Sequence, residues 1–452
     1  MELTEERKRR AAVLTIVLAS LLLFLFAWLD VMVNDENILE GLKTIATSQA
    51  ILITDYFLIG GVGATFLNAT LIFAFNFALV KLLRVKISGI HLASFFTVYG
   101  FSFFGKNIFN ILPFYLGGIL YGYYDHTEFK EVFPAISFST ALAPFVSEVA
   151  FRVDGHETSY INALLLGIIL GFIVTPLSKK LFEFHRGFNL YNLGFVGGII
   201  GAVTTSILKL YKFNVTPRSL ISTQYDLSLR IICMFLFFSL ILIGFYLNGN
   251  SFRGYPALLK DSGYKADFVV KYGFGATLIN MGVMGFIGLA FVYIWGMTLN
   301  GPFLAAIFTL VGFSAYGESI FNTIPILIGV SLGKYGTDTS TFTIILSALF
   351  ATALAPIPGV YGAHWGIVAG WLHIAVVQSI GVVHGGLNLY NNGFAAGIVA
   401  GVLHPVMEVV ASHREKSRNA YLQKQKELHE VLLLIRRREE EKENEEEETR
   451  EE

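Results

Sequence analysis

Long apolar stretches separated by short polar segments make up most of this chain of 452 residues. Many of them approach or exceed the roughly 18 residues with which a helix crosses a bilayer. The first covers residues 11–29 and follows a run of four basic residues, Arg7–Arg10. No small-residue cleavage pattern follows it, so we expect a retained helix rather than a signal peptide. The pattern predicts an all-α integral membrane protein.

The chain also repeats itself, in two halves. Eight of the 15 residues in 99–113 recur 212 positions later. At an offset of 199, the string HRGFNLYNLGF (185–195) matches HGGLNLYNNGF (384–394) at eight of 11 positions. These identities include asparagine, histidine and proline, so they indicate a true internal repeat rather than a shared membrane composition.

The same order of elements is predicted in both halves. The stretch 250–270 is too polar to span a membrane, so its apolar counterpart, 38–56, is expected to be interfacial as well. The first half is predicted to contain a helix at 11–29, the interfacial stretch 38–56, a helix at 57–80, a broken segment at 89–123, and helices at 132–150, 160–178 and 188–208. The second half is predicted to contain 231–247, 250–270, 272–296, 300–333, 339–355, 363–383 and 388–407. We therefore divide the chain into a first membrane repeat (1–215), a second membrane repeat (216–410) and a charged cytoplasmic tail (411–452).

The relative orientation of the halves depends on the broken segments. If these segments cross the membrane, each half crosses six times and the halves are parallel. If they enter and return, each half crosses five times and the halves are inverted. Inversion places seven lysines and arginines in cytoplasmic loops against four outside, and the parallel arrangement reverses the two groups. Since positive residues favour cytoplasmic loops, we favour two inverted repeats of about five transmembrane helices, each with a re-entrant segment and with both termini in the cytoplasm.

The broken segments are rich in polar and helix-breaking residues. In the first half, Gly100, Gly105 and Pro113 are expected to interrupt the helix. Irregular backbone cannot face lipid, so it must pack inside protein or line a wet cavity. We expect the two segments to meet near the midplane, where transporters of this plan bind their substrate. Side chains that could replace lost backbone partners, or the water around a solute, are Asn107, Asn110, Ser319 and Asn322.

One position carries charges of opposite sign in the two halves, Lys106 and Glu318. A charge at membrane depth costs at least about 2.5–3.5 kcal/mol, so such side chains pair with each other or line a pathway. Their equivalent positions predict a mutual ion pair near the symmetry axis. Two interpretations stay open: a salt bridge that fixes the segment tips together, or direct contact with a solute or a gate.

Further polar pairs recur inside the predicted helices. Thr65 and Asn68 lie about one helical turn apart and share a face, as do Thr277 and Asn280. They are candidates for hydrogen bonds between helices or for the solute path.

The histidines of the second repeated string, His185 and His384, each precede an Asn-Leu-Tyr-Asn sequence. Paired histidines could carry protons, because histidine titrates near neutral pH. The alternative is a helix-entry turn in which Asn189 and Asn388 cap backbone amides.

We expect structural roles for two more repeated features. The sequence Thr140–Pro144 recurs as Thr352–Pro356 and is expected to mark a kink or a helix end. Asp55 and Asp267 are expected at the membrane interface, with no catalytic role.

Composition excludes several classes of function. The net charge of −1 indicates no charged partner, and the single cysteine, Cys233, excludes an intrachain disulfide. No phosphate-binding loop or zinc motif is present. We expect no enzyme activity, no cofactor, no metal and no nucleic-acid partner.

The tail from His413 onward is basic first and acidic at its end. We expect a solvated, partly disordered segment, within which 422–435 could form a short amphipathic helix. The basic part can contact anionic lipid.

The strings FGKNIFN and HGGLNLYNNGF resemble those of a bacterial polytopic membrane family of unknown function. The plan of two inverted halves with re-entrant elements is similar in architecture to the urea channel family, and that resemblance implies trimers with one pore per subunit. The paired histidines are also a theme of ammonium channels.

The sequence thus predicts a channel or facilitator for a small polar solute or ion in the cell (cytoplasmic) membrane, forming homo-oligomers, either dimers or trimers. The alternative is a secondary transporter coupled to H⁺ or Na⁺. A membrane-embedded enzyme or a scaffold is the third class.

Overall fold

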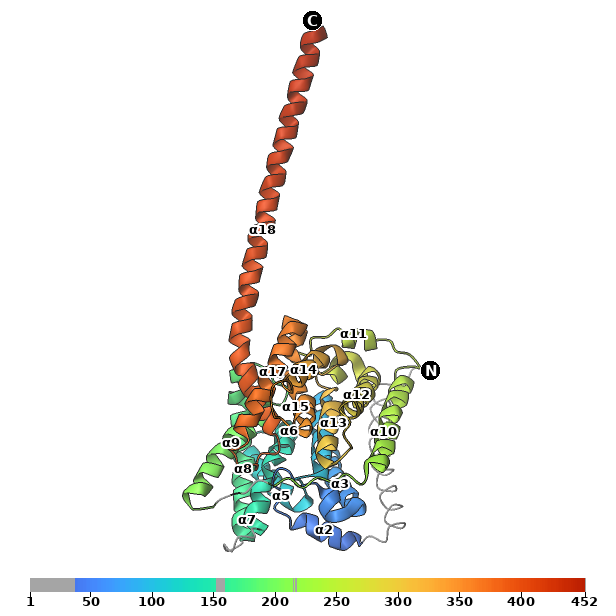
Figure 1. Ribbon diagram of the computed structural model, residues 1–452, viewed down its shortest axis with the longest axis vertical. Coiled ribbons are helices and arrows are strands. Elements are labelled where there is room, and N and C mark those ends of the chain that lie inside the picture. The colour runs from blue at the N-terminus through green and yellow to red at the C-terminus, as the bar shows by residue number, and fades with distance from the viewer. Residues whose placement is uncertain (1–36, 152–158, 214, 216–217, 452) are drawn as a thin grey trace. The chain divides into compact units, whose positions relative to one another are not determined.

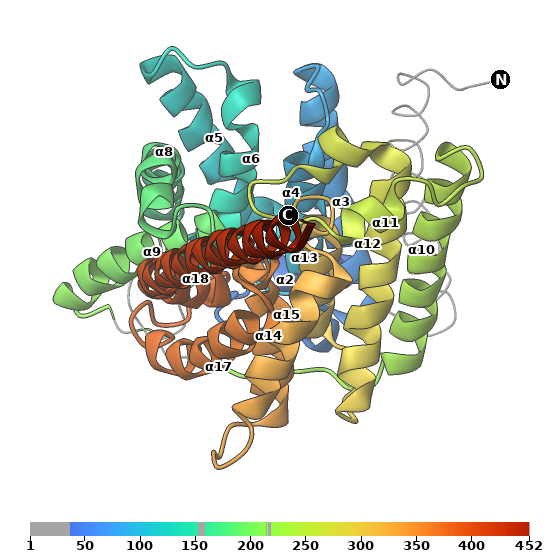
Figure 2. The ribbon, with the colours of Figure 1, turned by 90° about the horizontal axis from the view of Figure 1, so that it is seen from above.

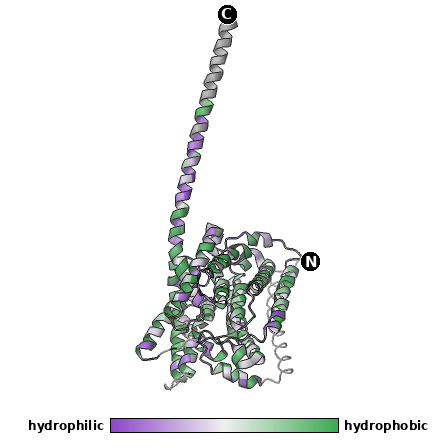
Figure 3. Cartoon of the chain, in the orientation of Figure 1, coloured by the Kyte–Doolittle hydropathy of each residue, from purple (hydrophilic) through white to green (hydrophobic). Residues whose placement is uncertain are grey.

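The computed structural model describes residues 37–151, 159–213, 215 and 218–451, so the helix expected at 11–29 lies outside the described residues. The chain divides into two compact units, Met1–Gly401 and Val402–Glu452. Every regular element of the described residues is a helix, and eight helices are long and apolar enough to cross a membrane. Apolar residues dominate the helices of the first unit in Figure 3.

The predicted elements that fall within the described residues are present in both halves (Figure 1). The first half contains α2 (Ile38–Ala46), α3 (Tyr56–Leu82), α4 (Gly89–Gly100), α5 (Ile108–Tyr124), α6 (Phe129–Ser139), α7 (Ala143–Phe151), α8 (Tyr160–His185) and α9 (Asn192–Leu210). The second contains α10 (Asp226–Leu247), α11 (Tyr255–Leu259), α12 (Phe268–Ile294), α13 (Gly301–Phe313), α14 (Ile320–Leu332), α15 (Thr341–Ala351), α16 (Pro356–Tyr361), α17 (Ala363–Ile380) and α18 (Asn391–Glu451). Helices α2 and α11 are too short to span a bilayer, as predicted.

The repeated Thr-Ala-Leu-Ala-Pro sequences form the predicted kinks. Single 3₁₀ turns at Thr140–Leu142 and Thr352–Leu354 interrupt otherwise helical segments. Each turn joins two short helices, α6 to α7 and α15 to α16. The proline that follows fixes its own φ and has no amide hydrogen, so it favours a new helix start over a continuous one.

Helices α4 and α5 form a hairpin. At its tip, Asn68 of α3 donates to the carbonyl of Lys106. Five residues further along α3, Phe73 contacts Phe95 of α4, and eight residues further Asn76 Oδ1 accepts from the hydroxyl of Tyr115 of α5. Both legs therefore leave the tip in the same direction along α3. In the second half, Asn280 of α12 donates to the carbonyl of Glu318 at the tip between α13 and α14.

The hairpins lie antiparallel, and the base of each is capped by the other half. Asp55 caps α3 by accepting from Phe57 N and also accepts from Gly301 N, the start of α13. Asp267 caps α12 by accepting from Val270 N and also accepts from Gly89 N, the start of α4. A charged acceptor is favourable at a helix N-terminus, where backbone amides have no helical partner. We expected the two aspartates at the membrane interface and did not predict that each would cap a helix of the other half.

Figure 2 shows how the halves are opposed within the first unit. The connections α3–α4 and α5–α6 reach one edge of this view. The connections α12–α13 and α14–α15 reach the opposite edge. Long helices α3 and α12 thus run in opposite directions.

The three residues expected to interrupt the helix in the first hairpin have different roles in the structure. The tip is at Gly105, which has φ +83°, and Gly317 has φ +111° in the second half. Gly100 is helical and lies against α13, where a Cβ would be 2.9 Å from the Cβ of Phe308. Pro113 lies inside α5 and packs against Gly167 of α8. Gly100 is the last residue of α4, so the helix does end there, whereas the prediction that Pro113 interrupts the helix was wrong. Both residues also serve close packing.

The second unit is the continuation of α18 from Val402. This helix is unbroken to Glu451. The helix expected at 422–435 is therefore confirmed as part of a longer one, and the prediction of a partly disordered acidic end was wrong. No glycine or proline follows Pro405, and the tail is rich in glutamate, lysine and arginine, which favour helix.

Candidate functional site

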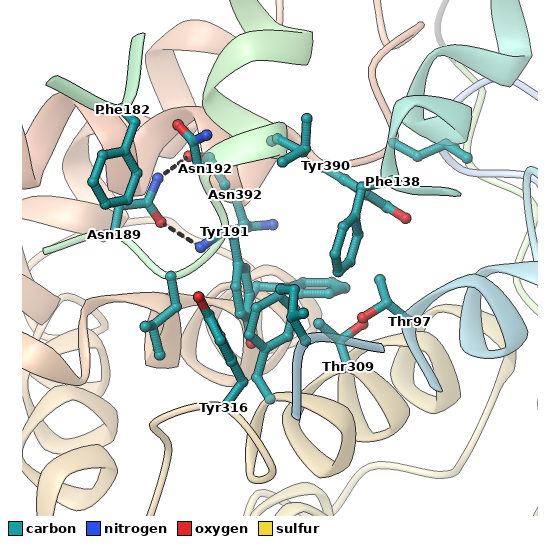
Figure 4. A pocket seen from close by; sticks show the side chains of 18 of the residues that line it. Thr97, Phe138, Phe182, Asn189, Tyr191, Asn192, Thr309, Tyr316, Tyr390 and Asn392 are labelled. Atoms are coloured by element: carbon teal, nitrogen blue, oxygen red, sulfur yellow. Dashed lines mark hydrogen bonds between the residues drawn. The ribbon is translucent and has the colours of Figure 1, made fainter. Parts of the chain in front are cut away.

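A cavity of about 170 Å³ lies between the two halves, near the middle of α4 and α13. Its wall is built largely of residues from equivalent positions in both repeats. These pairs are Thr97 and Thr309, Phe101 and Phe313, Phe138 and Phe350, Leu190 and Leu389, Tyr191 and Tyr390, and Gly194 and Gly393. Figure 4 shows the tyrosines, threonines and nearby asparagines around it. The cavity is therefore lined by corresponding positions of the two halves.

The Asn-Leu-Tyr-Asn sequences form the turns that position the tyrosines. Asn189 Oδ1 accepts from Tyr191 N at 2.9 Å, and Asn388 Oδ1 accepts from Tyr390 N at 3.1 Å. Leu190 N donates to a carbonyl of the other half, that of Ala353, at 2.8 Å. Each turn is thus held from both halves. The predicted capping of backbone amides by the two asparagines is confirmed.

The wall contains one unusual polar group. The Thr97 hydroxyl is buried and has no hydrogen-bond partner in the described part of the chain. Its counterpart, Thr309, donates to the carbonyl of Ala305 in its own helix. Buried polar atoms are nearly always paired, so an unpaired hydroxyl on a cavity wall indicates a place for a bound molecule.

Lys106 lies behind one of the tyrosines and is fully buried. Its Nζ donates to Thr140 Oγ1 at 2.8 Å and to the Tyr390 hydroxyl at 2.5 Å. The same ammonium lies 4.5 Å from the centre of the Tyr390 ring, a cation–π contact.

Glu318 occupies the equivalent place in the second half and is also fully buried. The hydroxyls of Tyr191 and Thr352 lie beside it, and they share a contact of 3.3 Å with each other. Neither carboxylate oxygen makes a hydrogen bond of normal geometry with the described residues.

Lys106 and Glu318 do not form the expected ion pair. Lys106 contacts Thr140 and Tyr390, whereas Glu318 lies beside Tyr191 and Thr352. The arrangement of the hairpins explains the error. The tip of the first hairpin reaches the start of α13, where a Cβ on Gly301 would be 2.7 Å from the carbonyl oxygen of Phe103. The second tip reaches the start of α4. Helix α13 has 13 residues, so the tips are separated by about 20 Å along it.

The other predicted tip residues stabilise the hairpins. Asn107 and Asn110 form a reciprocal cap at the start of α5. At the start of α14, Asn322 Oδ1 accepts from Ser319 N at 2.8 Å. Asn110 also bonds the carbonyl of Gly105, which fixes the tip. These four side chains do not line the cavity.

The polar pairs on α3 and α12 have two different roles. Asn68 and Asn280 each donate to two carbonyls of a hairpin tip, so hydrogen bonding between segments is confirmed. Thr65 and Thr277 bond carbonyls within their own helices, those of Gly61 and Gly273, where the helix is kinked. None of these side chains lines the cavity.

The histidines are part of the two turns. His185 Nε2 contacts Asn192 Oδ1 at 2.9 Å, and His384 Nε2 contacts Asn391 Oδ1 at 2.7 Å. Both rings are fully buried and neither lines the cavity. The geometry agrees with the helix-entry turn.

Sequence reasoning missed the residues that form the wall, notably Tyr191, Tyr390 and Thr97. The tyrosines lay inside a repeated string, and that repetition was the available signal. No group of three or more histidine, cysteine, aspartate or glutamate side chains that could hold a metal ion occurs among the described residues.

A family model described as "Protein of unknown function (DUF1576)" matches residues 34–210 and 247–409. The chain belongs to this family. The two matched regions correspond to the two repeats. No curated protein matches the chain. No solved structure matches it either, so the architectural resemblance to the urea channel family stays a prediction.

Proposed function

We propose that this protein carries a small solute across the membrane through its central cavity. The observation that supports this most directly is the cavity between the halves, with a wall built from corresponding positions of both repeats. Binding at a repeat interface near the bilayer midplane is the common plan of secondary transporters.

In this proposal the repeats are inverted in the membrane and the hairpins are re-entrant. The opposed directions of α3 and α12 support inversion (Figure 2). The hairpin contacts along α3 support re-entry, because both ends of α4–α5 lie on the same side of the tip. The loops 125–128 and 333–340 then lie on opposite sides of the membrane, the first in the cytoplasm.

The wall defines the class of solute. A cavity of about 170 Å³ is close in size to an engineered protein cavity that binds benzene. Aromatic rings form much of its wall, with hydroxyls and amides between them, and among the described residues Lys265 is the one charged side chain that reaches it. This lining suits a small solute with an apolar face and one or two hydrogen-bonding groups.

The cavity is covered unequally at its two ends, which favours a carrier over an open channel. Wall residues Ile90 and Tyr316, near the start of α4, are only half-buried. Their counterparts at the other end, Pro302 and Phe104, are buried.

At the closed end the segment that links the halves lies against the start of α3. Leu220 N donates to the carbonyl of Ile53, and Asp55 N donates to the carbonyl of Leu220. A cavity open at one end at a time is the geometry of alternating access.

Flux through reconstituted protein tests the proposal. Liposomes containing wild-type protein should take up at least one of labelled urea, glycerol, glycine or benzoate faster than protein-free liposomes. Thr97→Phe, which fills the cavity, should abolish this uptake, and Thr70→Phe on α3, outside the cavity wall, should not. Uptake that is unchanged in Thr97→Phe would contradict a path through the cavity.

A further inference from the structure

The two repeats contain the same small polar site with one charge exchanged. In the first, Lys106 lies with Thr140 and with Tyr390 of the other half. In the second, Glu318 lies with Thr352 and with Tyr191 of the other half. The threonines match at the offset of 212 and the tyrosines at 199. The two sites are therefore equivalent in position and differ in the sign of one side chain.

In the first site, the amino group of Lys106 lies at the centre. The Lys106 ammonium lies between two hydroxyl oxygens, at 2.8 Å from Thr140 and 2.5 Å from Tyr390. No carboxylate lies within 4 Å of it among the described residues, so hydroxyls and ring faces provide its stabilisation.

In the second site, the same kind of hydroxyls surround a carboxylate. Glu318 is fully buried, and its two oxygens make no hydrogen bond of normal geometry with the described residues, although the hydroxyls of Tyr191 and Thr352 lie beside them. An ionised carboxylate in such a place is very costly unless a cation or proton accompanies it. Tyr191 is the titratable side chain that faces it in the described part of the chain.

We propose that Glu318, Tyr191 and Thr352 bind an exchangeable monovalent cation, H⁺ or Na⁺, in the place that the Lys106 ammonium takes in the other repeat. A carboxylate and two hydroxyls offer only oxygen atoms, which are the donors that hard cations prefer. Tyr191 also lines the central cavity, so the cation site and the solute site share a residue. This inference rests on the proposed function and makes the protein a cation-coupled carrier. Occupancy of the two sites is then linked by a reciprocal coupling free energy.

The melting temperature of the purified full-length protein in detergent tests the site. It is measured in NaCl and in choline chloride at constant ionic strength, over a series of pH values. A ligand that binds only the folded state raises its stability. We expect a rise of about 5 °C or more from saturating Na⁺, or a comparable rise on acidification if the proton is the ligand.

Glu318→Gln should remove both responses, because the neutral amide keeps the shape and loses the charge. Glu148→Gln is the matched control, since Glu148 is equally buried but lies in α7, outside the site. Loss of the response in Glu318→Gln alone supports the site. No response to either ion in the wild-type protein, or an unchanged response in Glu318→Gln, would overturn it.

The symmetry of the two sites gives a second variant. Glu318→Lys should place an ammonium against Tyr191 and Thr352, as Lys106 is placed against Tyr390 and Thr140. This variant should fold and should melt at a temperature independent of Na⁺, and a Na⁺ response that persists in it would contradict the proposal.

Addition of Na⁺ to weakly buffered wild-type protein separates the two ions. Release of protons shows that they compete for one site, whereas stabilisation without release assigns Na⁺ alone. These measurements need no solute. A cation response without any flux would refute the proposed transport and leave the cation site intact, and flux without a cation response would do the reverse.

Discussion

Replacement of Asp55 by alanine should destabilise the protein more than any other single loss of a carboxylate discussed above. Asp55 is fully buried and accepts from three backbone amides of three separate segments. These are Phe57 N at 3.0 Å in α3, Ser222 N at 2.9 Å in the segment between the halves, and Gly301 N at 3.2 Å in α13. The substitution leaves all three amides buried without this partner.

The magnitude follows from the contacts. Loss of a helix cap costs about 1 kcal/mol. Each of the other two hydrogen bonds to a charged acceptor contributes about 1.5–3 kcal/mol. Burial of the carboxylate offsets part of this sum, since it raises the pKa of Asp55 to about 6 against three opposing backbone hydrogen bonds. We therefore expect a loss of about 4 kcal/mol from Asp55→Ala.

The half-buried counterpart, Asp267, makes fewer links to other segments, so Asp267→Ala should cost about half as much. The assay is thermal or denaturant unfolding of detergent-purified variants, followed by monodispersity in size-exclusion chromatography. Asp338→Ala on an exposed loop is the control and should change nothing. Equal stability of Asp55→Ala and Asp338→Ala would refute the idea that Asp55 joins the two halves.

Three further predictions concern the same framework. Gly301→Ala should destabilise the fold by about 1–3 kcal/mol, because a Cβ at this position would lie 2.7 Å from an oxygen of Asp55. A free energy of unfolding within about 0.5 kcal/mol of wild type, measured by denaturant unfolding, would contradict this contact. Asn280→Leu should cost about 2–4 kcal/mol in the same assay, since it leaves two tip carbonyls unpaired; an equal loss in Asn280→Asp, which also lacks the amide donor, checks the cause. In the pH series, burial raises the pKa of Asp55 to about 6, so the extra stability that comes from protonation of this carboxyl is fully present below pH 4 (roughly) and is lost as the pH rises through 6. The three backbone hydrogen bonds that Asp55 accepts persist above that pH. Asp55→Asn should remove this slope, and a slope that persists would assign it to another group.

The sequence was sufficient to predict most of the architecture. The repeat offsets placed both hairpins and both kinks at the right positions, because glycine, proline and asparagine recur where the backbone needs them. The exact tip could not be placed. Gly100, Gly105 and Pro113 all disfavour helix, and only packing shows that Gly100 is needed for the contact with α13.

The site was harder to predict, since it depends on how the two halves approach each other. Equal spacing in each repeat suggested that Lys106 and Glu318 meet on the axis. The hairpins instead overlap along the length of α13, so corresponding residues meet near the middle of α4 and α13, as Phe96 and Phe308 do, and the tips stay apart. Tyr191 and Tyr390 reach the cavity from turns that cross between the halves, and a linear sequence gives no measure of that crossing.

Side-specific labelling tests the central claim, that the two hairpins enter the membrane from opposite sides. Single cysteines at the exposed residues His126 and Asp338, in a Cys233→Ala background, are treated in intact cells with a membrane-impermeant maleimide. The inverted arrangement predicts that the cysteine at 338 reacts in intact cells and that the one at 126 reacts only after permeabilisation. Reaction of both from the same side would contradict the inverted repeats and the carrier built on them.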